Sequence, residues 1–302
     1  MNSLRTFRRR KLKHYLMLLP FFALFAVFFL YPIVYGVAIS LSKWDGVHPA
    51  TFVGVKNYLD VINHPKFGLA MGNLLKFMVI VVPVGILIAL GLALLVDRFT
   101  SRWASVFRAI YFFPIVISLV LSSVIWRFLL SPEPVGLVNT VLAKVGITGI
   151  SWLNDPNYEI AAVAIVDMWH AIGFHFLLLF AGLKAIPIEY YEAAMVDGAT
   201  GFQRIRHISI PLLEPVLFLV AVNAVIGGLQ SFEVPWLLSN SQPNNYGGVG
   251  GGMLFPVMDI YVRAWQGLAF GNAAAYAMIL LALTLFVTSV QFAWRRWRMN
   301  YY

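Results

Sequence analysis

Six long stretches of this sequence carry no charged side chain, and they limit what the chain can fold into. A helix that crosses a lipid bilayer needs about 20 mostly apolar residues. The stretches are 15–42, 77–96, 109–126, 168–183 (extended upstream through Asp167 to about Ile160), 215–232 and 268–294. We therefore expect an all-α, polytopic membrane protein with six transmembrane helices.

The composition supports lipid as the solvent for much of the chain. Hydrophobic residues make up 60% and charged residues 12% of the 302 positions, whereas soluble domains are about half apolar and about a quarter charged. The sequence contains no cysteine. Disulfides, thiolate metal sites and cysteine nucleophiles are therefore excluded.

The distribution of Lys and Arg predicts the orientation of the helices. If the N-terminus is inside, the inner segments 1–14, 97–108, 184–211 and 295–302 hold 15 of the 22 basic residues in 62 positions. The outer segments 43–76, 127–159 and 233–267 hold 7 in 102 positions. Because cytoplasmic loops are enriched in basic residues, we expect both termini to be cytoplasmic.

The same reasoning divides the chain into three parts. We expect a basic cytoplasmic tail at 1–14, a six-helix transmembrane domain at 15–294 and a second cytoplasmic tail at 295–302. The run Arg8-Arg9-Arg10-Lys11 is interpreted as a topology anchor at the anionic inner leaflet, and no nucleic-acid partner is expected.

Polar residues share one face of the fifth apolar stretch. Asn223, Gly227 and Gln230 follow at i, i+4 and i+7, so they project from the same side of a helix. Polar groups at membrane depth face the bundle interior or a water-filled path. Hydrogen bonding between helices is the alternative explanation, and the sequence leaves both open.

The inner segment 184–211 contains local signals for a helix–turn–helix. They are Pro187 in a first helical turn, Glu189 and Glu192 near a helix N-terminus, Asp197 and Gly198 at a helix end, Thr200 and Gln203 as a capping box, and Pro211 before the next helix. We therefore predict two short helices joined by a tight turn. An amphipathic helix lying on the membrane surface would have the same shape.

The spacing within this segment resembles the EAA loop of ATP-binding-cassette importer permeases. The matching residues are Glu192-Ala193-Ala194, Gly198 after three further residues, and Ile208-Ser209-Ile210-Pro211 nine residues later, with Ile210 where the family usually has Leu. Asp197-Gly198-Ala199 is similar to the carbohydrate-uptake branch. Weaker matches to the same branch precede this segment and occur in the family's order, at Leu18-Leu19-Pro20, Tyr31-Pro32, Trp44-Asp45, Phe113-Pro114 and Ala181-Gly182-Leu183.

The resemblance implies a fold like that of MetI and the maltose permeases, and a role in importing a sugar or sugar derivative across a bacterial or archaeal cytoplasmic (inner) membrane. The implied partners are a second homologous permease, two ATP-binding-cassette ATPases, an extracytoplasmic solute-binding protein and membrane lipid. ATP and Mg²⁺ would bind on the ATPases, with no cofactor on this chain. The family's coupling residues correspond to Glu192, Ala193, Ala194, Asp197, Gly198, Ile208 and Pro211, with Glu192 as polar anchor and the alanines as a close-approach face.

On this interpretation Asn223, Gly227, Gln230 and Glu233 are candidates for lining the sugar path. No catalytic residue and no metal site is expected, since G-x-x-x-x-G-K-[ST] and H-E-x-x-H are absent. The glycine cluster at 247–252 is interpreted as a flexible outer loop. The alternatives are an ion-gradient-driven secondary transporter and a membrane enzyme using Asp167 and His170 as an acid–base pair. The sequence does not name the sugar.

Overall fold

The structure, a computed structural model, describes residues 17–98, 101–147, 149–239 and 246–299. The predicted anchor within 1–14 and the last residues of the C-terminal tail lie outside this part. The chain divides into two compact units, one formed by Met1–Asn63 with Ile260–Ile279 and the other by His64–Asp259 with Leu280–Tyr302.

The first unit contains one long apolar helix and a small hairpin. Its elements are the helical span Met17–Ser40, which includes the π-helical turn η1 (Ala26–Leu30) and α2 (Tyr31–Ser40), then β1 (Ser42–Lys43), β2 (Thr51–Phe52), α3 (Lys56–Ile62) and η4 (Val262–Gln266). β1 pairs antiparallel with β2. Within the span only Ile39 and Ser40 are buried, as expected for a helix whose sides meet lipid or another subunit.

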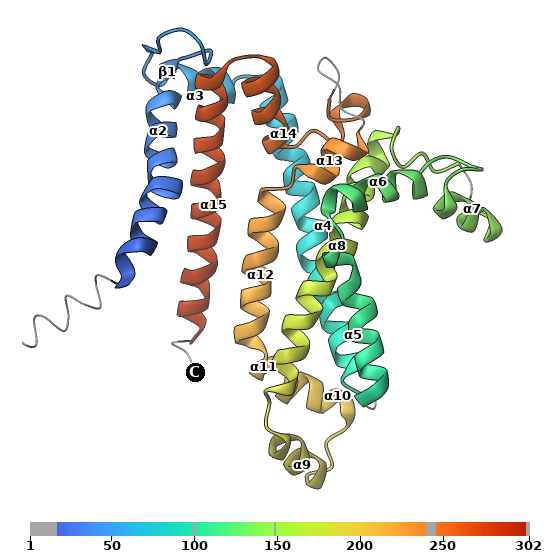
Figure 1. Ribbon diagram of the computed structural model, residues 1–302. Coiled ribbons are helices and arrows are strands. Elements are labelled where there is room, and N and C mark those ends of the chain that lie inside the picture. The colour runs from blue at the N-terminus through green and yellow to red at the C-terminus, as the bar shows by residue number, and fades with distance from the viewer. Residues whose placement is uncertain (1–16, 99–100, 148, 240–245, 300–302) are drawn as a thin grey trace, which may run out of the picture. The chain divides into compact units, whose positions relative to one another are not determined.

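The second unit contains most of the helices (Figure 1). They are α4 (Pro65–Val96), α5 (Ser101–Val116), α6 (Leu119–Leu129), α7 (Leu137–Lys144), α8 (Pro156–Lys184), α9 (Ile188–Val196), α10 (Gly201–Arg204), η2 (Ile205–Ser209), α11 (Ile210–Leu212), α12 (Glu214–Leu229), α13 (Glu233–Leu238) and η3 (Val249–Gly251). Two further helices, α14 (Pro256–Tyr261) and α15 (Phe270–Met299), have residues in both units.

The core of the second unit lies between α4, α8 and α12. Ala89 and Ala93 of α4 pack in one buried cluster with Phe176 and Leu179 of α8 and with Val220 of α12. Small residues at four-residue spacing let helix backbones approach closely. The four-residue spacing of Ala89 and Ala93 thus suits the close packing of α4 against α8 and α12.

The number of membrane spans is between four and six, by length and composition of the described residues. Four helices qualify alone, namely Met17–Ser40, Pro65–Val96, Pro156–Lys184 and Phe270–Arg298. Two further pairs qualify only as bent pairs, Ser105–Val116 with Leu119–Leu129 at 98° and Gly201–Leu212 with Glu214–Leu229 at 67°. The predicted count of six holds if each bent pair is one span.

The third predicted span is not the continuous helix that its uncharged run indicated. The backbone is extended at Ser118, with ψ 136°, and this separates α5 from α6. Non-helical backbone at membrane depth needs partners for its polar groups, and a ring nitrogen of His170, on α8, lies 3.1 Å from the carbonyl oxygen of Ile117. His170 thus has a structural role at the break.

The glycine-rich loop, residues 247–252, is not the loose outer loop that its composition predicted. The backbone N–H of Val249 donates to Oε1 of Glu159 at 2.7 Å, and this carboxylate from α8 is fully buried. The side-chain amide of Asn73 donates to the carbonyl oxygens of Gly251 at 2.7 Å and Leu254 at 3.1 Å. Side chains from α4 and α8 therefore hold the loop in one conformation.

Candidate functional site

Segment 184–211 folds as its local signals predicted. α9 ends at a turn in which Gly198 has φ +76°. Thr200 and Gln203 form both hydrogen bonds of a capping box at the start of α10. Pro187 differs from the prediction, because it is the N-cap residue that precedes α9 and not a residue of its first turn.

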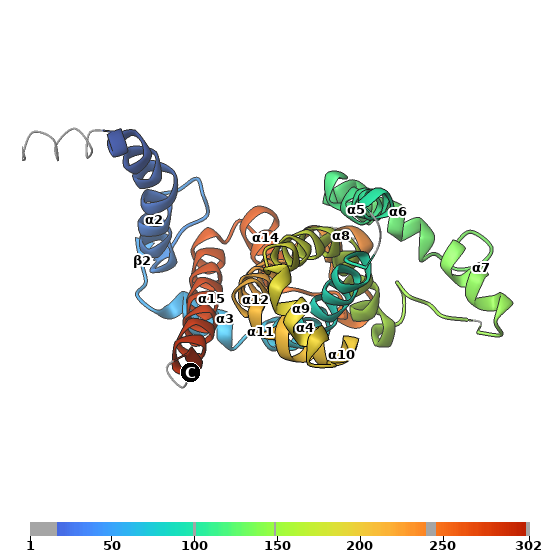
Figure 2. The same ribbon diagram turned by 90° about the horizontal axis from the view of Figure 1, so that it is seen from below.

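The two short helices project from the end of the second unit (Figure 1), and in the view from below they lie over the ends of α4, α5 and α8 (Figure 2). No residue of α9 is buried. Large apolar side chains are among the exposed ones: Val196 of α9 is 89% exposed and Phe202 of α10 is 70% exposed. Exposed apolar groups gathered on one surface mark an interaction site.

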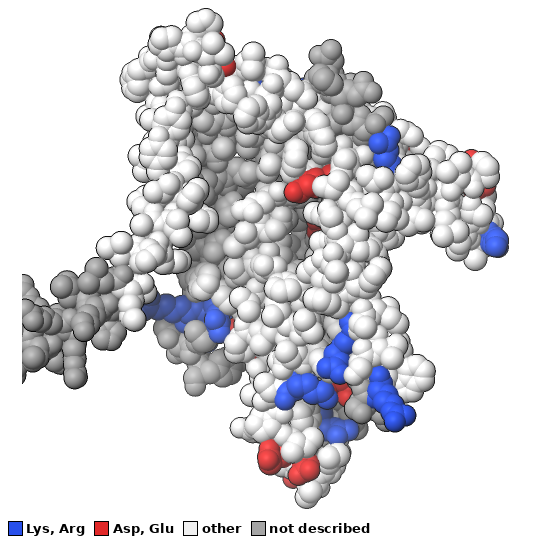
Figure 3. Space-filling model, viewed as in Figure 1, with Lys and Arg blue, Asp and Glu red and all other residues white. Residues whose placement is uncertain are grey.

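The residues of the EAA-like pattern lie along this projecting surface. Glu192, Ala193, Asp197, Gly198 and Pro211 are exposed, and Ala194 and Ile208 are half-buried. Figure 3 shows acidic side chains at the tip of the segment and basic ones around its base. The surface thus combines apolar groups with charges of both signs, which suits contact with another protein.

Three contacts that hold this surface were not predicted from the sequence. The hydroxyl groups of Tyr191 and Ser209 lie 3.0 Å apart and join α9 to η2. Lys184, at the end of α8, forms an ion pair with Asp97 at 2.7 Å. Glu214, at the start of α12, accepts from Arg295 of α15 at 3.2 Å. The pairs formed by Lys184 and Glu214 lie at the two ends of segment 184–211 and join them to the end of α4 and to α15.

The four candidate path residues are all exposed. Asn223 and Gly227 lie on α12 and Gln230 is its C-cap. Glu233 is not on that helix, because the backbone changes direction at Phe232 (φ −138°, ψ −55°) and Glu233 begins α13. The amide oxygen of Asn223 lies 3.3 Å from a ring nitrogen of the buried His175. Asn223 thus takes part in a hydrogen bond between helices, and the side chain of Gln230 is exposed at the end of α12.

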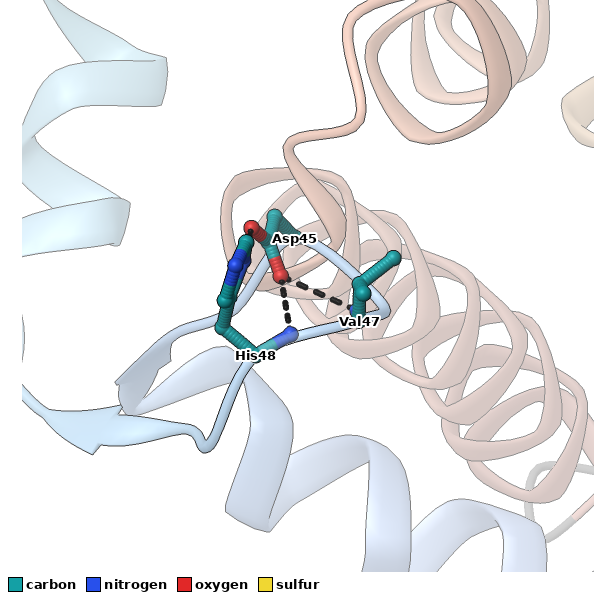
Figure 4. Close-up of polar contacts among 3 residues, drawn as sticks. All are labelled: Asp45, Val47 and His48. Carbon is teal, nitrogen blue, oxygen red and sulfur yellow. Dashed lines mark hydrogen bonds and ion pairs between the residues drawn. The ribbon is translucent and has the colours of Figure 1, made fainter.

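A cavity in the first unit was also not predicted. This hairpin cavity has a volume of about 710 Å³ and is lined by the β1–β2 connection, α3 and residues 267–272. Asp45 organises the connection (Figure 4): its Oδ1 accepts from the backbone N–H of Val47 at 3.0 Å and of His48 at 2.9 Å. Its Oδ2 lies 2.6 Å from Nδ1 of His48. An Asp-Gly pair is a turn signal, so Asp45-Gly46 could have revealed the turn but not the cavity.

The contact between Asp45 and His48 changes the pKa of both groups. Hydrogen bonds from the His48 side chain and backbone hold the pKa of the Asp45 carboxyl well below its usual range. The carboxylate in turn raises the pKa of His48 above 6.5. The ion pair is therefore formed below the raised pKa of His48, persists on mild acidification because the pKa of Asp45 is lowered, and is lost as pH rises through the pKa of His48.

Replacing Asp45 by Asn should return the pKa of His48 towards its ordinary value, since the acceptor charge is removed. The measurement is an NMR titration of the His48 ring proton in the full chain in detergent. Asp60→Asn is the matched control, because Asp60 also lines the hairpin cavity but does not contact His48 in any described interaction. Equal pKa values for His48 in wild type and Asp45→Asn would contradict the assignment.

Among the described residues, no group of three or more His, Asp or Glu side chains could hold a metal ion.

Comparison with known proteins identifies relatives of the chain. The sequence pattern of the family described as "Binding-protein-dependent transport system inner membrane component" matches residues 81–297. The chain is 31% identical over 302 residues to the trehalose/maltose transport system permease protein MalF of Thermococcus litoralis, covering 99% of both chains. It is 31% identical over 294 residues to the arabinooligosaccharides transport system permease protein AraP of Bacillus subtilis, covering 94% of this chain and 88% of the relative.

Solved structures share the fold. A chain of a bacterial ABC transporter involved in the import of the acidic polysaccharide alginate has a TM-score of 0.82 and 24% identity, covering 97% of this chain and 98% of that chain. A chain of the bacterial alginate ABC transporter in complex with an alginate pentasaccharide-bound periplasmic protein has a TM-score of 0.79. The expectation of a MetI-like helical permease fold is therefore confirmed. The relatives named above are transport permeases, not enzymes.

Proposed function

Because the chain belongs to the family of binding-protein-dependent transport system inner membrane components, we propose that it is the permease subunit of an importer that moves a sugar or sugar derivative inward, driven by ATP hydrolysis on partner subunits. The observation that carries the proposal is the projecting surface of segment 184–211. Its apolar side chains are exposed, and the chain itself has no P-loop. A coupling surface for separate ATPases explains both facts.

The assembly that we propose contains this chain, a second homologous permease, two ATP-binding-cassette ATPases that bind ATP and Mg²⁺, and an extracytoplasmic solute-binding protein. Segment 184–211 would enter a groove on one ATPase, with Glu192 as the polar anchor, Ala193 and Ala194 as the close-approach face and Gly198 setting the angle. The pairs Lys184–Asp97 and Glu214–Arg295 would pass movement of this segment to α4, α8, α12 and α15.

The proposed location is the cytoplasmic membrane of a bacterium or archaeon, with the chain crossing it several times and both termini inside. The apolar helices and the excess of basic residues in 97–108, 184–211 and 295–302 support this orientation.

Reconstitution of the assembly tests the proposal. The complex would be placed in liposomes containing ATP, with the binding protein outside, and uptake of labelled sugars would be measured. We expect uptake that requires ATP and the binding protein. Uptake by this chain without ATPases, driven by an ion gradient, would instead support the secondary transporter.

Within this function, Gln230→Leu should lower sugar uptake by about fivefold, because one hydrogen bond to a passing hydroxyl is worth about 1 kcal/mol. Gln230→Asn, which keeps the amide, should retain more activity. Val222→Leu is the control, since Val222 lies on α12 but is half-buried. Uptake rates measured at equal amounts of assembled complex would decide the point, and an unchanged rate for Gln230→Leu would remove this residue from the path.

A further inference from the structure

Two lysines of the hairpin cavity lie in an outer segment that holds more basic residues than the other outer segments. The outer segment 43–76 holds four basic residues in 34 positions, whereas the other two outer segments hold three in 68. Lys43 and Lys56 both line the cavity. Because basic residues are depleted from outer loops in general, two of them at one cavity point to a function there.

The walls of the cavity are rigidly built from segments far apart in the sequence. The buried side chain of Asn57 donates to the carbonyl oxygens of Ser40 at 2.8 Å and Ser42 at 2.9 Å. The backbone N–H of Gly271 donates to the carbonyl oxygen of Trp44 at 3.3 Å. A side chain at Gly271 would overlap the carbonyl oxygen of Ser42. The cavity therefore exists before any partner arrives, which favours binding without rearrangement.

Some charged groups of the cavity have partners within the chain and others form no ion pair among the described residues. Asp45 is engaged by His48 and by two backbone N–H groups. Lys43 and Lys56 are exposed, and no ion pair to either is formed among the described residues. Asp60, also exposed, is the one other carboxylate of the lining. Apart from the Asp45–His48 pair, the lining therefore carries two cationic side chains and one carboxylate. This excess of positive charge favours an anionic ligand.

We propose that the hairpin cavity receives a carboxylate-bearing surface loop of the extracytoplasmic solute-binding protein, with Lys43 and Lys56 as its cationic contacts. This inference rests on the proposed function, which places the cavity on the outer side and requires such a protein. Lysines on flexible stems recognise carboxylates as point charges. Complementary charges of this kind raise the rate of encounter and fix the register of the complex.

The test uses the assembled complex in nanodiscs and the solute-binding protein that stimulates the wild-type ATPase. ATPase activity is measured against the concentration of binding protein at low and high salt. We expect Lys43→Glu with Lys56→Glu to raise the half-saturating concentration at least about tenfold and leave the maximal rate unchanged. Lys43→Gln with Lys56→Gln should give a smaller increase and a weaker dependence on salt.

Lys144→Glu is the matched control, because Lys144 is an exposed outer lysine on α7 away from the cavity lining. An unchanged half-saturating concentration in the cavity variants would overturn the inference. So would an equal shift in Lys144→Glu, or a lower maximal rate with unchanged half-saturation. If no binding protein stimulates the wild-type complex, the proposed function itself fails, and that result is distinct from the others.

Discussion

A Gly198→Val substitution should lower binding-protein-stimulated ATPase activity and sugar uptake by at least about 5–30-fold, the ratio that corresponds to 1–2 kcal/mol. Gly198 has φ +76°, a left-handed conformation that costs residues with a Cβ about 1–2 kcal/mol and β-branched residues more. A Cβ at this position would meet no atom within 4 Å. The cost therefore lies in the backbone of the turn, and the turn sets the angle between α9 and α10.

Two companion variants separate this effect from loss of folding. Gly198→Asn should be milder, because Asn tolerates the left-handed conformation. Gly201→Ala should be nearly silent, since Gly201 has no positive φ and the nearest atom to its added Cβ is 4.0 Å away, on Arg204. Size-exclusion chromatography would establish that the permease still assembles. Full stimulated activity in assembled Gly198→Val would exclude the proposed coupling role.

The second large effect is expected in the glycine-rich loop. Gly248→Ala should destabilise the permease by about 2–6 kcal/mol, the sum of the cost of a backbone region that is essentially restricted to glycine (φ +80°, ψ −172°) and of overpacking. Gly248 has φ +80°, and its added Cβ would lie 2.5 Å from Oε2 and 2.7 Å from Oε1 of Glu159. Glu159 is fully buried, so its carboxylate has no open space into which it can move. Thermal unfolding of the purified chain in detergent measures the loss.

Gly250→Ala is the matched control in the same loop. Gly250 also has a positive φ, +64°, but the nearest atom to its added Cβ is Cγ of Pro156 at 3.4 Å, so only the backbone cost of about 1–2 kcal/mol applies. Combining Gly248→Ala with Glu159→Ala removes the overlap, and the two losses should be less than additive. Equal losses in Gly248→Ala and Gly250→Ala would show that the carboxylate does not shape the loop.

Local signals explain why segment 184–211 could be predicted in detail. A capping box joins residues three apart, as at Thr200 and Gln203, and a glycine such as Gly198 ends a helix by its own backbone freedom. Both depend on neighbours in the sequence. The helical spacing predicted that Asn223 lies on α12 and Gln230 at its end, but it gave no sign of the partner His175 or of the change of direction before Glu233.

The breaks and anchored loops depend on residues far away in the sequence. The uncharged run 109–126 contains Pro114, which lies inside α5 and does not mark the break, and the partner of the Ile117 carbonyl is His170, 53 residues later. The glycines at 247–252 indicated a loose loop because local composition does not show distant partners. The partner of Val249 is Glu159, 90 residues away. The hairpin cavity likewise requires 43–60 and 267–272 to meet.

The sequence by itself determined that the chain is a helical membrane protein, where along the chain its apolar helices lie, and that segment 184–211 folds as two short helices around Gly198. The start of α4 was not determined in this way, because the helix begins at Pro65 and the uncharged stretch only at 77. Hydrophobicity and backbone preference act locally, so both can be read along the chain. The tertiary structure alone decided that the third span is bent, that Glu159 organises the glycine-rich loop and that Lys43 and Lys56 share a cavity. These features arise from contacts between distant residues, and no local preference encodes them.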